Sequence, residues 1–169
     1  DFYFIYVHQG EGYLPDEITY NIQNAVMELT EADMYVSATG DDNNSGLNPN
    51  EPLQNIHYAI TKIKADSLNP RNVYVADGLY SPSLNNQYFA LHMKSYVNVI
   101  GESRENTILD LEGGLSFIDA YDKTSDEIPI QAAWSVKNFK IINFVRAYSR
   151  CIGLYDNRNV LLQNIEIAD

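Results

Sequence analysis

The 169-residue chain has a single cysteine, Cys151, and no basic run longer than a pair. One cysteine forms no disulfide within the chain, so the fold depends on a hydrophobic core rather than on covalent cross-links. Phosphate binding needs clusters of Lys and Arg, which argues against nucleic acid and against an anionic membrane surface as partners. No apolar stretch reaches the length of a membrane span either.

The composition is strongly acidic: 11 basic and 23 acidic residues give a net charge of −12, while 45 % of the residues are hydrophobic. This hydrophobic content suffices for one domain with a real core. An acidic surface suits cations or neutral sugars, and it repels an anionic polysaccharide unless a divalent cation bridges the two. The 13 tyrosines and one tryptophan offer faces that stack on sugar rings. Among them, Trp134 and Tyr121 are the predicted carbohydrate-binding residues.

A weak repeat is the main clue to the architecture. Residues 138–144 and 159–165 have matching apolar positions 21 residues apart (159 − 138), so that Phe139 corresponds to Val160. A repeat of this length, built from short β segments, predicts a parallel solenoid in which successive turns of the chain lie on one another.

Asparagines recur with the same period. Asn143 and Asn164 are 21 positions apart (164 − 143), and Asn138 and Asn159 have the same spacing. Either row is a candidate polar binding stripe. The structural interpretation is favoured, because Asn side chains that stack at turns satisfy buried backbone groups along the axis of the coil.

The remaining elements follow from local patterns. A helix is expected from Pro52 to Ala65, because Pro suits a first helical turn and the apolar residues that follow lie on one face. Residues 119–133 break the strand pattern and predict a protruding loop. Short strands are expected over residues 34–37, 73–75, 97–100, 107–109 and 117–118.

The chain divides into two parts. Residues 1–33 predict an apolar strand at Phe2–Val7 and a helix that opens at Pro15, which form a cap or the end of a preceding segment. Residues 34–169 contain the cap and rungs of the coil, which we expect to be open at the C-terminal end. An open coil and a free apolar strand predict a homo-oligomer formed by strand addition or end stacking.

One block carries a more specific signal. Residues 34–42 read MYVSATGDD, residues 73–80 read VYVADGLY, and residues 106–110 read NTILD. This block resembles the N-terminal cap and opening rungs of right-handed parallel β-helix proteins of the pectin-lyase-like superfamily. The resemblance implies an all-β solenoid: a right-handed, single-stranded parallel β-helix with rungs of about 21 residues and an N-terminal α-helical cap. It also implies an extracellular or cell-surface protein that contacts polysaccharide, but no catalytic residue carries over to this chain.

The loop after the first strand of this block is a candidate calcium site. Asp41, Asn43 and Ser45 place oxygen ligands at alternate positions before Gly46, as in the opening of a calcium-binding loop. The twelfth position is Pro52 instead of the required Glu, so an Asx turn leading into the helix is the favoured interpretation. No other cofactor is expected.

An acidic cluster is the only candidate for hydrolytic chemistry. Two carboxylates from it could perform acid–base catalysis, but no spacing fixes a pair, and a solvated loop is the favoured interpretation. The cluster consists of Asp110, Asp119, Asp122, Asp126 and Glu127.

Two functions of different class are therefore compared. The favoured one is a non-catalytic extracellular or cell-surface module that has a structural role or binds carbohydrate. The alternative is the N-terminal fragment of a polysaccharide lyase or glycoside hydrolase. The sequence contains many residues that build a fold and no recognisable catalytic motif, which favours the first.

Overall fold

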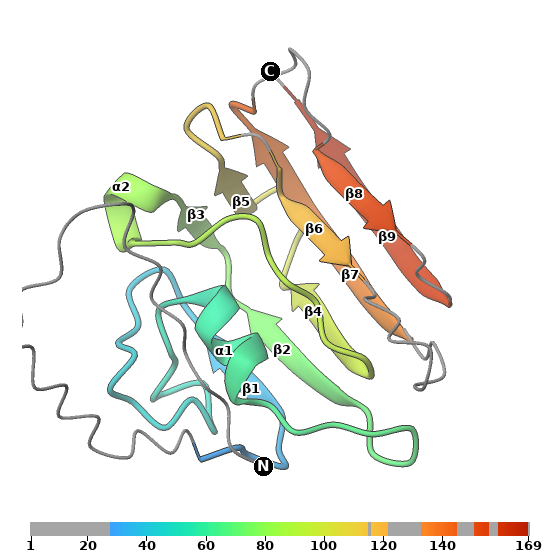
Figure 1. The fold of residues 1–169 in the computed structure, drawn as a ribbon. Coiled ribbons are helices and arrows are strands. Elements are labelled where there is room, and N and C mark those ends of the chain that lie inside the picture. The colour runs from blue at the N-terminus through green and yellow to red at the C-terminus, as the bar shows by residue number, and fades with distance from the viewer. Residues whose placement is uncertain (1–27, 115, 122–132, 145–150, 156–158, 169) are drawn as a thin grey trace, which may run out of the picture.

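The structure is a computed structural model, shown in Figure 1. It describes residues 28–114, 116–121, 133–144, 151–155 and 159–168. The expected strand at Phe2–Val7 and nearly all of the helix that was expected after Pro15 lie outside these residues, so both stay predictions.

The described residues form a mostly parallel β-sheet of seven strands, a separate two-stranded sheet and two short helices. The large sheet has the order β1-β2-β4-β7-β5-β3, with β9 paired to β7, and the small sheet pairs β6 with β8. The strands are β1 (Met34–Val36), β2 (Arg71–Val75), β3 (Gly78–Tyr80), β4 (Val97–Gly101), β5 (Thr107–Asp110), β6 (Ile118–Tyr121), β7 (Trp134–Ile142), β8 (Ile152–Tyr155) and β9 (Val160–Ile167).

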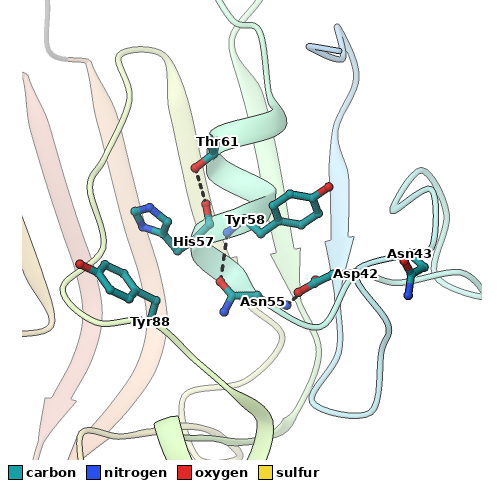
Figure 2. Close-up of a pocket in the computed structure, with 7 residues that line it drawn as sticks. All are labelled: Asp42, Asn43, Asn55, His57, Tyr58, Thr61 and Tyr88. Carbon is teal, nitrogen blue, oxygen red and sulfur yellow. Dashed lines mark hydrogen bonds between the residues drawn. The ribbon is translucent and has the colours of Figure 1, made fainter. Parts of the chain in front are cut away.

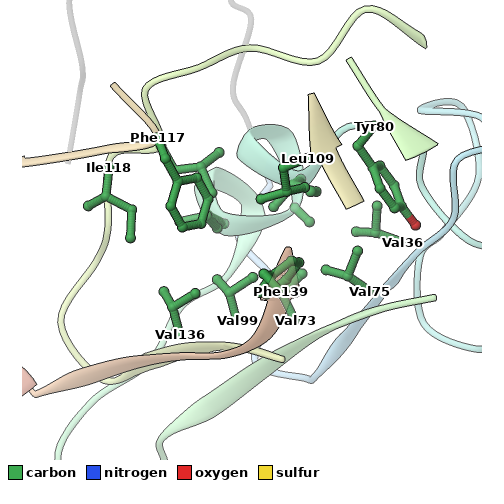
Figure 3. Close-up of a cluster of buried hydrophobic side chains, with 14 of the residues drawn as sticks. Val36, Val73, Val75, Tyr80, Val99, Leu109, Phe117, Ile118, Val136 and Phe139 are labelled. Atoms are coloured by element: carbon green, nitrogen blue, oxygen red, sulfur yellow. The ribbon is translucent and has the colours of Figure 1, made fainter. Parts of the chain in front are cut away.

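Alternation along the strands builds the core. In β1 and β4 every second residue is buried, as the period of two predicts, and in β2 the same holds for Val73 and Val75. Figure 3 shows the inward side chains of these strands and of β7 pointing toward Leu109, Phe117 and Tyr80. The rings of Phe117 and Phe139 lie 6.2 Å apart at the centre of this cluster.

The first helix, α1 (Ile56–Lys62), is shorter than the predicted span but lies within it. It begins after Asn55, whose side-chain oxygen accepts a hydrogen bond from the backbone N–H of Tyr58 at 3.0 Å. At its other end, Lys94 Nζ donates to the carbonyls of Thr61 and Ile63, at 3.2 and 2.6 Å, which satisfies acceptors that the helix leaves open. The second helix, α2 (Pro82–Asn85), was not predicted.

The predicted all-β solenoid, a parallel β-helix with 21-residue rungs, is wrong. The large sheet is neither closed nor solenoid-like. Phe139 and Val160 lie on paired strands, but Phe139 pairs with Ile165, 26 positions on (165 − 139). Elsewhere the offset is 39 between Met34 and Val73 (73 − 34). The pairing is parallel, but it follows no fixed period.

The wrong period has a physical cause in four asparagines. Asn138, Asn143, Asn159 and Asn164 all have a positive φ, between 54° and 62°, a conformation that Asn tolerates better than most residues. We call each of these positions a corner. Their spacing favours the wrong period, because an offset of 21 matches two pairs (138 with 159, 143 with 164), whereas an offset of 26 matches only Asn138 with Asn164. The structure pairs the corner at Asn138 with the corner at Asn164, and Asn164 Nδ2 donates to Asn138 Oδ1 at 3.0 Å.

The predicted strands are otherwise confirmed in position. Residues 34–37, 73–75, 97–100 and 107–109 fall on β1, β2, β4 and β5 to within one or two residues at the ends. The predicted loop over residues 119–133 is wrong at its start, because β6 extends to Tyr121; residues 122–132 lie outside the described chain.

Candidate functional site

An open depression with a volume of about 600 Å³ lies beside α1 (Figure 2). Three segments that are distant in the sequence contribute to it: the loop after β1, helix α1 with its N-cap, and the segment that follows α2. The lining residues are Asp42, Asn43, Asn55, His57, Tyr58, Thr61 and Tyr88.

The loop after β1 is tied to the start of α1 by Asp42. Its Oδ1 accepts hydrogen bonds from the backbone N–H groups of Gln54 and Asn55, both at 2.9 Å. An anion at this position interacts favourably with the open N–H groups at the start of a helix. A carboxylate has about four acceptor positions, so two bonds leave Asp42 with acceptor capacity toward the depression.

The third segment is held in place by Gln87. Its side-chain oxygen accepts from the backbone N–H of Ile56 at 3.2 Å, and its Nε2 donates to the carbonyl of Gln54 at 2.8 Å. Asn55 Nδ2 adds a bond to the carbonyl of Asn86 at 2.7 Å. These bonds place Tyr88 beside α1, where 57 % of the residue stays exposed.

Aromatic rings flank α1, with His57 and Tyr88 on one side of the helix and Tyr58 on the other (Figure 2). The His57 ring lies 5.1 Å from the Tyr88 ring and 5.5 Å from the His92 ring, with edge-to-face geometry in both pairs. Lys62 Nζ lies 5.2 Å from the centre of the Tyr58 ring. The aromatic contact surface of the depression is therefore the pair formed by His57 and the exposed Tyr88 ring.

The surroundings of His57 favour its neutral form. Burial lowers the pKa of His57 below its usual value, and the neighbouring His92 lowers this pKa further. Its Nδ1 atom is buried and has no hydrogen-bond partner among the described residues. A neutral imidazole can donate from one nitrogen and accept at the other, which suits contact with hydroxyl groups.

The lining of the depression combines aromatic faces with hydrogen-bonding groups. It offers two amides, a hydroxyl, an imidazole, one carboxylate and two tyrosines, the mixture of aromatic faces and hydrogen-bonding groups that sugars match. Glycoside hydrolysis requires a pair of carboxylic groups at a defined separation. The lining supplies only Asp42, which already bonds to the backbone of α1.

The structure places the predicted calcium ligands in an Asx turn. Asp41 Oδ1 accepts from the backbone N–H and the Nδ2 of Asn43, at 2.9 and 2.8 Å, and Ser45 Oγ lies 3.0 Å from Glu51 Oε2. Of these predicted ligands, only Asn43 also lines the depression. Across the described ranges, no group of three or more His, Cys, Asp or Glu side chains could hold a metal ion. Calcium binding stays a prediction.

Of the two predicted carbohydrate-binding aromatics, Trp134 does not line the depression. Trp134 begins β7 and is 3 % exposed, as part of the hydrophobic core, so a sugar cannot stack on it without unfolding of the core. Tyr121 ends β6, where its backbone pairs with that of Tyr155 in β8. Of the acidic cluster, Asp110 Oδ2 accepts from Asn143 Nδ2 at 3.0 Å; residues 122–132, which include three of its members, lie outside the described chain.

Sequence reasoning missed Tyr88, His57 and Asp42 as a group. The bonds that join their segments span 12 to 33 positions, and no local pattern indicates such contacts. The one available signal for these contacts was the run of polar residues from Asn85 to Gln87. Such a run is unusual beside buried residues.

Comparisons with protein-family models, curated proteins and solved structures found no match. The resemblance to the pectin-lyase-like superfamily therefore stays a prediction. Among the described residues, no helix has the length and apolar character that a membrane crossing requires.

Proposed function

We propose that the chain is a non-catalytic carbohydrate-binding module of the cell surface or extracellular space, and that the depression beside α1 binds a neutral oligosaccharide. The observation that carries this proposal is the position of Tyr88. This largely exposed ring stands against His57 and opposite the polar side chains of the loop after β1. The placement outside the cell rests on the sequence resemblance alone.

The chemistry of the lining supports a sugar without charge. The apolar face of one sugar ring packs on the Tyr88 ring, and hydroxyl groups along the oligosaccharide bond to the polar lining residues His57, Asp42 and Asn43. The net charge of −12 and the carboxylate of Asp42 disfavour a uronate polymer in the same place.

Titration calorimetry tests the proposal with neutral oligosaccharides of several linkages and with oligogalacturonate as the charged comparison. We expect binding of at least one neutral class, with Tyr88→Ala weakening it roughly tenfold, since an aromatic contact contributes about 1.4 kcal/mol. Tyr74→Ala is the matched control, because Tyr74 is also exposed but stacks on Tyr35 at 5.3 Å on β2.

Three results would contradict the proposal. Failure of every neutral class to bind removes the function, and equal binding by wild type and Tyr88→Ala removes the site. Release of new reducing ends from the same polymers contradicts the non-catalytic role and favours the alternative, a fragment of a polysaccharide-degrading enzyme.

A further inference from the structure

The two outer strands of the path β1-β2-β4-β7-β9 differ in how they are covered. The free edge of β1 is bonded to the loop that follows it: Tyr35 N–H donates to the Gly46 carbonyl at 2.8 Å, and Leu53 N–H donates to the Tyr35 carbonyl at 2.9 Å. Within the described residues, β9 pairs with β7 alone. An uncovered edge strand offers unpaired backbone groups to another strand.

The inward side chains of β9 are also left partly open. They stand in register with Trp134, Val136, Phe139 and Ile141 of β7, all of which are at most 3 % exposed. In β9 the corresponding residues are only partly buried, and Ile167 is 45 % exposed. The core therefore ends in an apolar row that one more strand would cover. This row consists of Val160, Leu162, Ile165 and Ile167.

The apolar row is symmetric about its own centre. Val160 and Leu162 are the first and third residues of β9, and Ile167 and Ile165 are the first and third residues counted from its other end. If two copies of β9 pair antiparallel about an axis between Gln163 and Asn164, Leu162 of one copy faces Ile165 of the other. All four apolar side chains then stay on the inner face, which a strand shifted by one residue would not allow.

The corner at Asn164 fits the same axis. Its left-handed backbone, with a φ of 55°, lies directly beside this axis, which exchanges residues 160–163 of one copy with residues 164–167 of the other. Local charge does not oppose the pairing of two β9 strands. Glu166 is the one charged residue of β9, and its carboxylate lies 3.1 Å from Lys140 Nζ and 3.6 Å from Arg104 Nε.

We infer that β9 is a self-association surface and that its occupant is the β9 of a second copy, paired antiparallel about a two-fold axis. A head-to-tail assembly would instead place β9 against β1, whose edge is already bonded to its own loop. The isologous pair is therefore the closed arrangement that this sheet allows. The net charge of −12 on each copy weakens the dimer at low salt, so that association tightens as salt is added.

Sedimentation velocity across a wide concentration series tests the inference. We expect a monomer–dimer equilibrium that Leu162→Arg shifts to the monomer, because a charge enters the covered apolar row. Leu47→Arg is the control: Leu47 is 49 % exposed and lies in the loop next to β1, so this variant should dimerise like wild type. Circular dichroism of each variant separates dissociation from unfolding.

Cysteine cross-linking tests the register without relying on Leu162. In a Cys151→Ala background, the double variant Leu161→Cys/Glu166→Cys places the two thiols opposite each other across the axis, within the Cα separation that a disulfide accepts. Each single variant places like thiols too far apart to join. Oxidation should therefore give a covalent dimer with the double variant only.

Several outcomes would overturn the inference. A strict monomer at every concentration removes the surface, and dimers that survive Leu162→Arg place the contact elsewhere. Cross-linking of single variants as efficiently as the double variant contradicts the antiparallel register. None of these results bears on the sugar site, because Leu162→Arg should leave oligosaccharide binding unchanged.

Discussion

The hydrogen bonds by which Asn138 joins β7 to β4 and β9 can be tested by removing the Asn138 side chain. Asn138 Nδ2 donates to the Gly101 carbonyl at 3.1 Å, and its Oδ1 accepts from Asn164 Nδ2 at 3.0 Å. The residue also has a φ of 62°, where the β-carbon of an ordinary side chain is strained. Asn138→Ala therefore removes two hydrogen bonds and keeps the strained backbone.

The expected loss follows from these contacts. Each hydrogen bond contributes about 0.5–1.5 kcal/mol, and we take the lower value for the exposed bond to Asn164. Together with about 1 kcal/mol for the left-handed backbone, Asn138→Ala should lower the free energy of unfolding by about 3 kcal/mol. A double-mutant cycle with Asn164→Ala isolates the bond between the two side chains, with an expected coupling energy of about 0.5–1 kcal/mol.

Urea unfolding of the full chain provides the measurement, with the slope of each transition checked for two-state behaviour. The matched control is the cycle between Asn143 and Asn164, the pair that a 21-residue period would bring together. We expect no coupling there, because Asn143 Nδ2 donates instead to Asp110. Coupling in the control cycle together with none between Asn138 and Asn164 would refute the 26-residue register.

Two further predictions concern stability. Gly101→Ala should destabilise the fold by more than about 2 kcal/mol in the same urea assay, because its new β-carbon would lie 2.2 Å from the Asn138 carbonyl oxygen, a backbone atom; unchanged stability would contradict this close approach. The lowered pKa of His57 means that the unfolded chain binds its proton first, so stability should fall as the pH drops below about 6.5. His57→Gln should remove this part of the pH dependence, and an identical pH profile for both proteins would count against it.

Local patterns in the sequence were sufficient for strand positions but not for pairing. Alternation in Met34–Val36 and Val97–Gly101 depends only on which face of a strand is buried, and neighbours along the chain report this directly. Pairing depends on which corner stacks on which, and the Asn spacing favours an offset of 21, which matches two pairs, over the observed offset of 26, which matches one. The period was wrong for that reason, although the parallel direction of the pairing was right.

The candidate site was harder to predict because it is assembled by polar side chains acting over long range. Trp134 has the chemistry of a sugar platform, but its register opposite Val160 places it inside the core. Tyr88 has the same chemistry and stays exposed, because Gln87 and Asn55 bind its segment to the first turn of α1. Residue type alone cannot separate these two outcomes, since burial is decided by partners about thirty positions away.

The two proposals concern opposite ends of the same sheet. The depression is built on the loop and helix beside β1, and the self-association surface is β9 at the other end of the strand order (Figure 1). A dimer through β9 therefore leaves both depressions free, at its two far ends. A polymer with repeated binding units can contact both depressions of one dimer. The second contact then forms at a high effective concentration, which compensates for weak binding by a single shallow depression. If both proposals hold, an open site suffices for attachment to a polysaccharide surface, because two weak contacts must be released together.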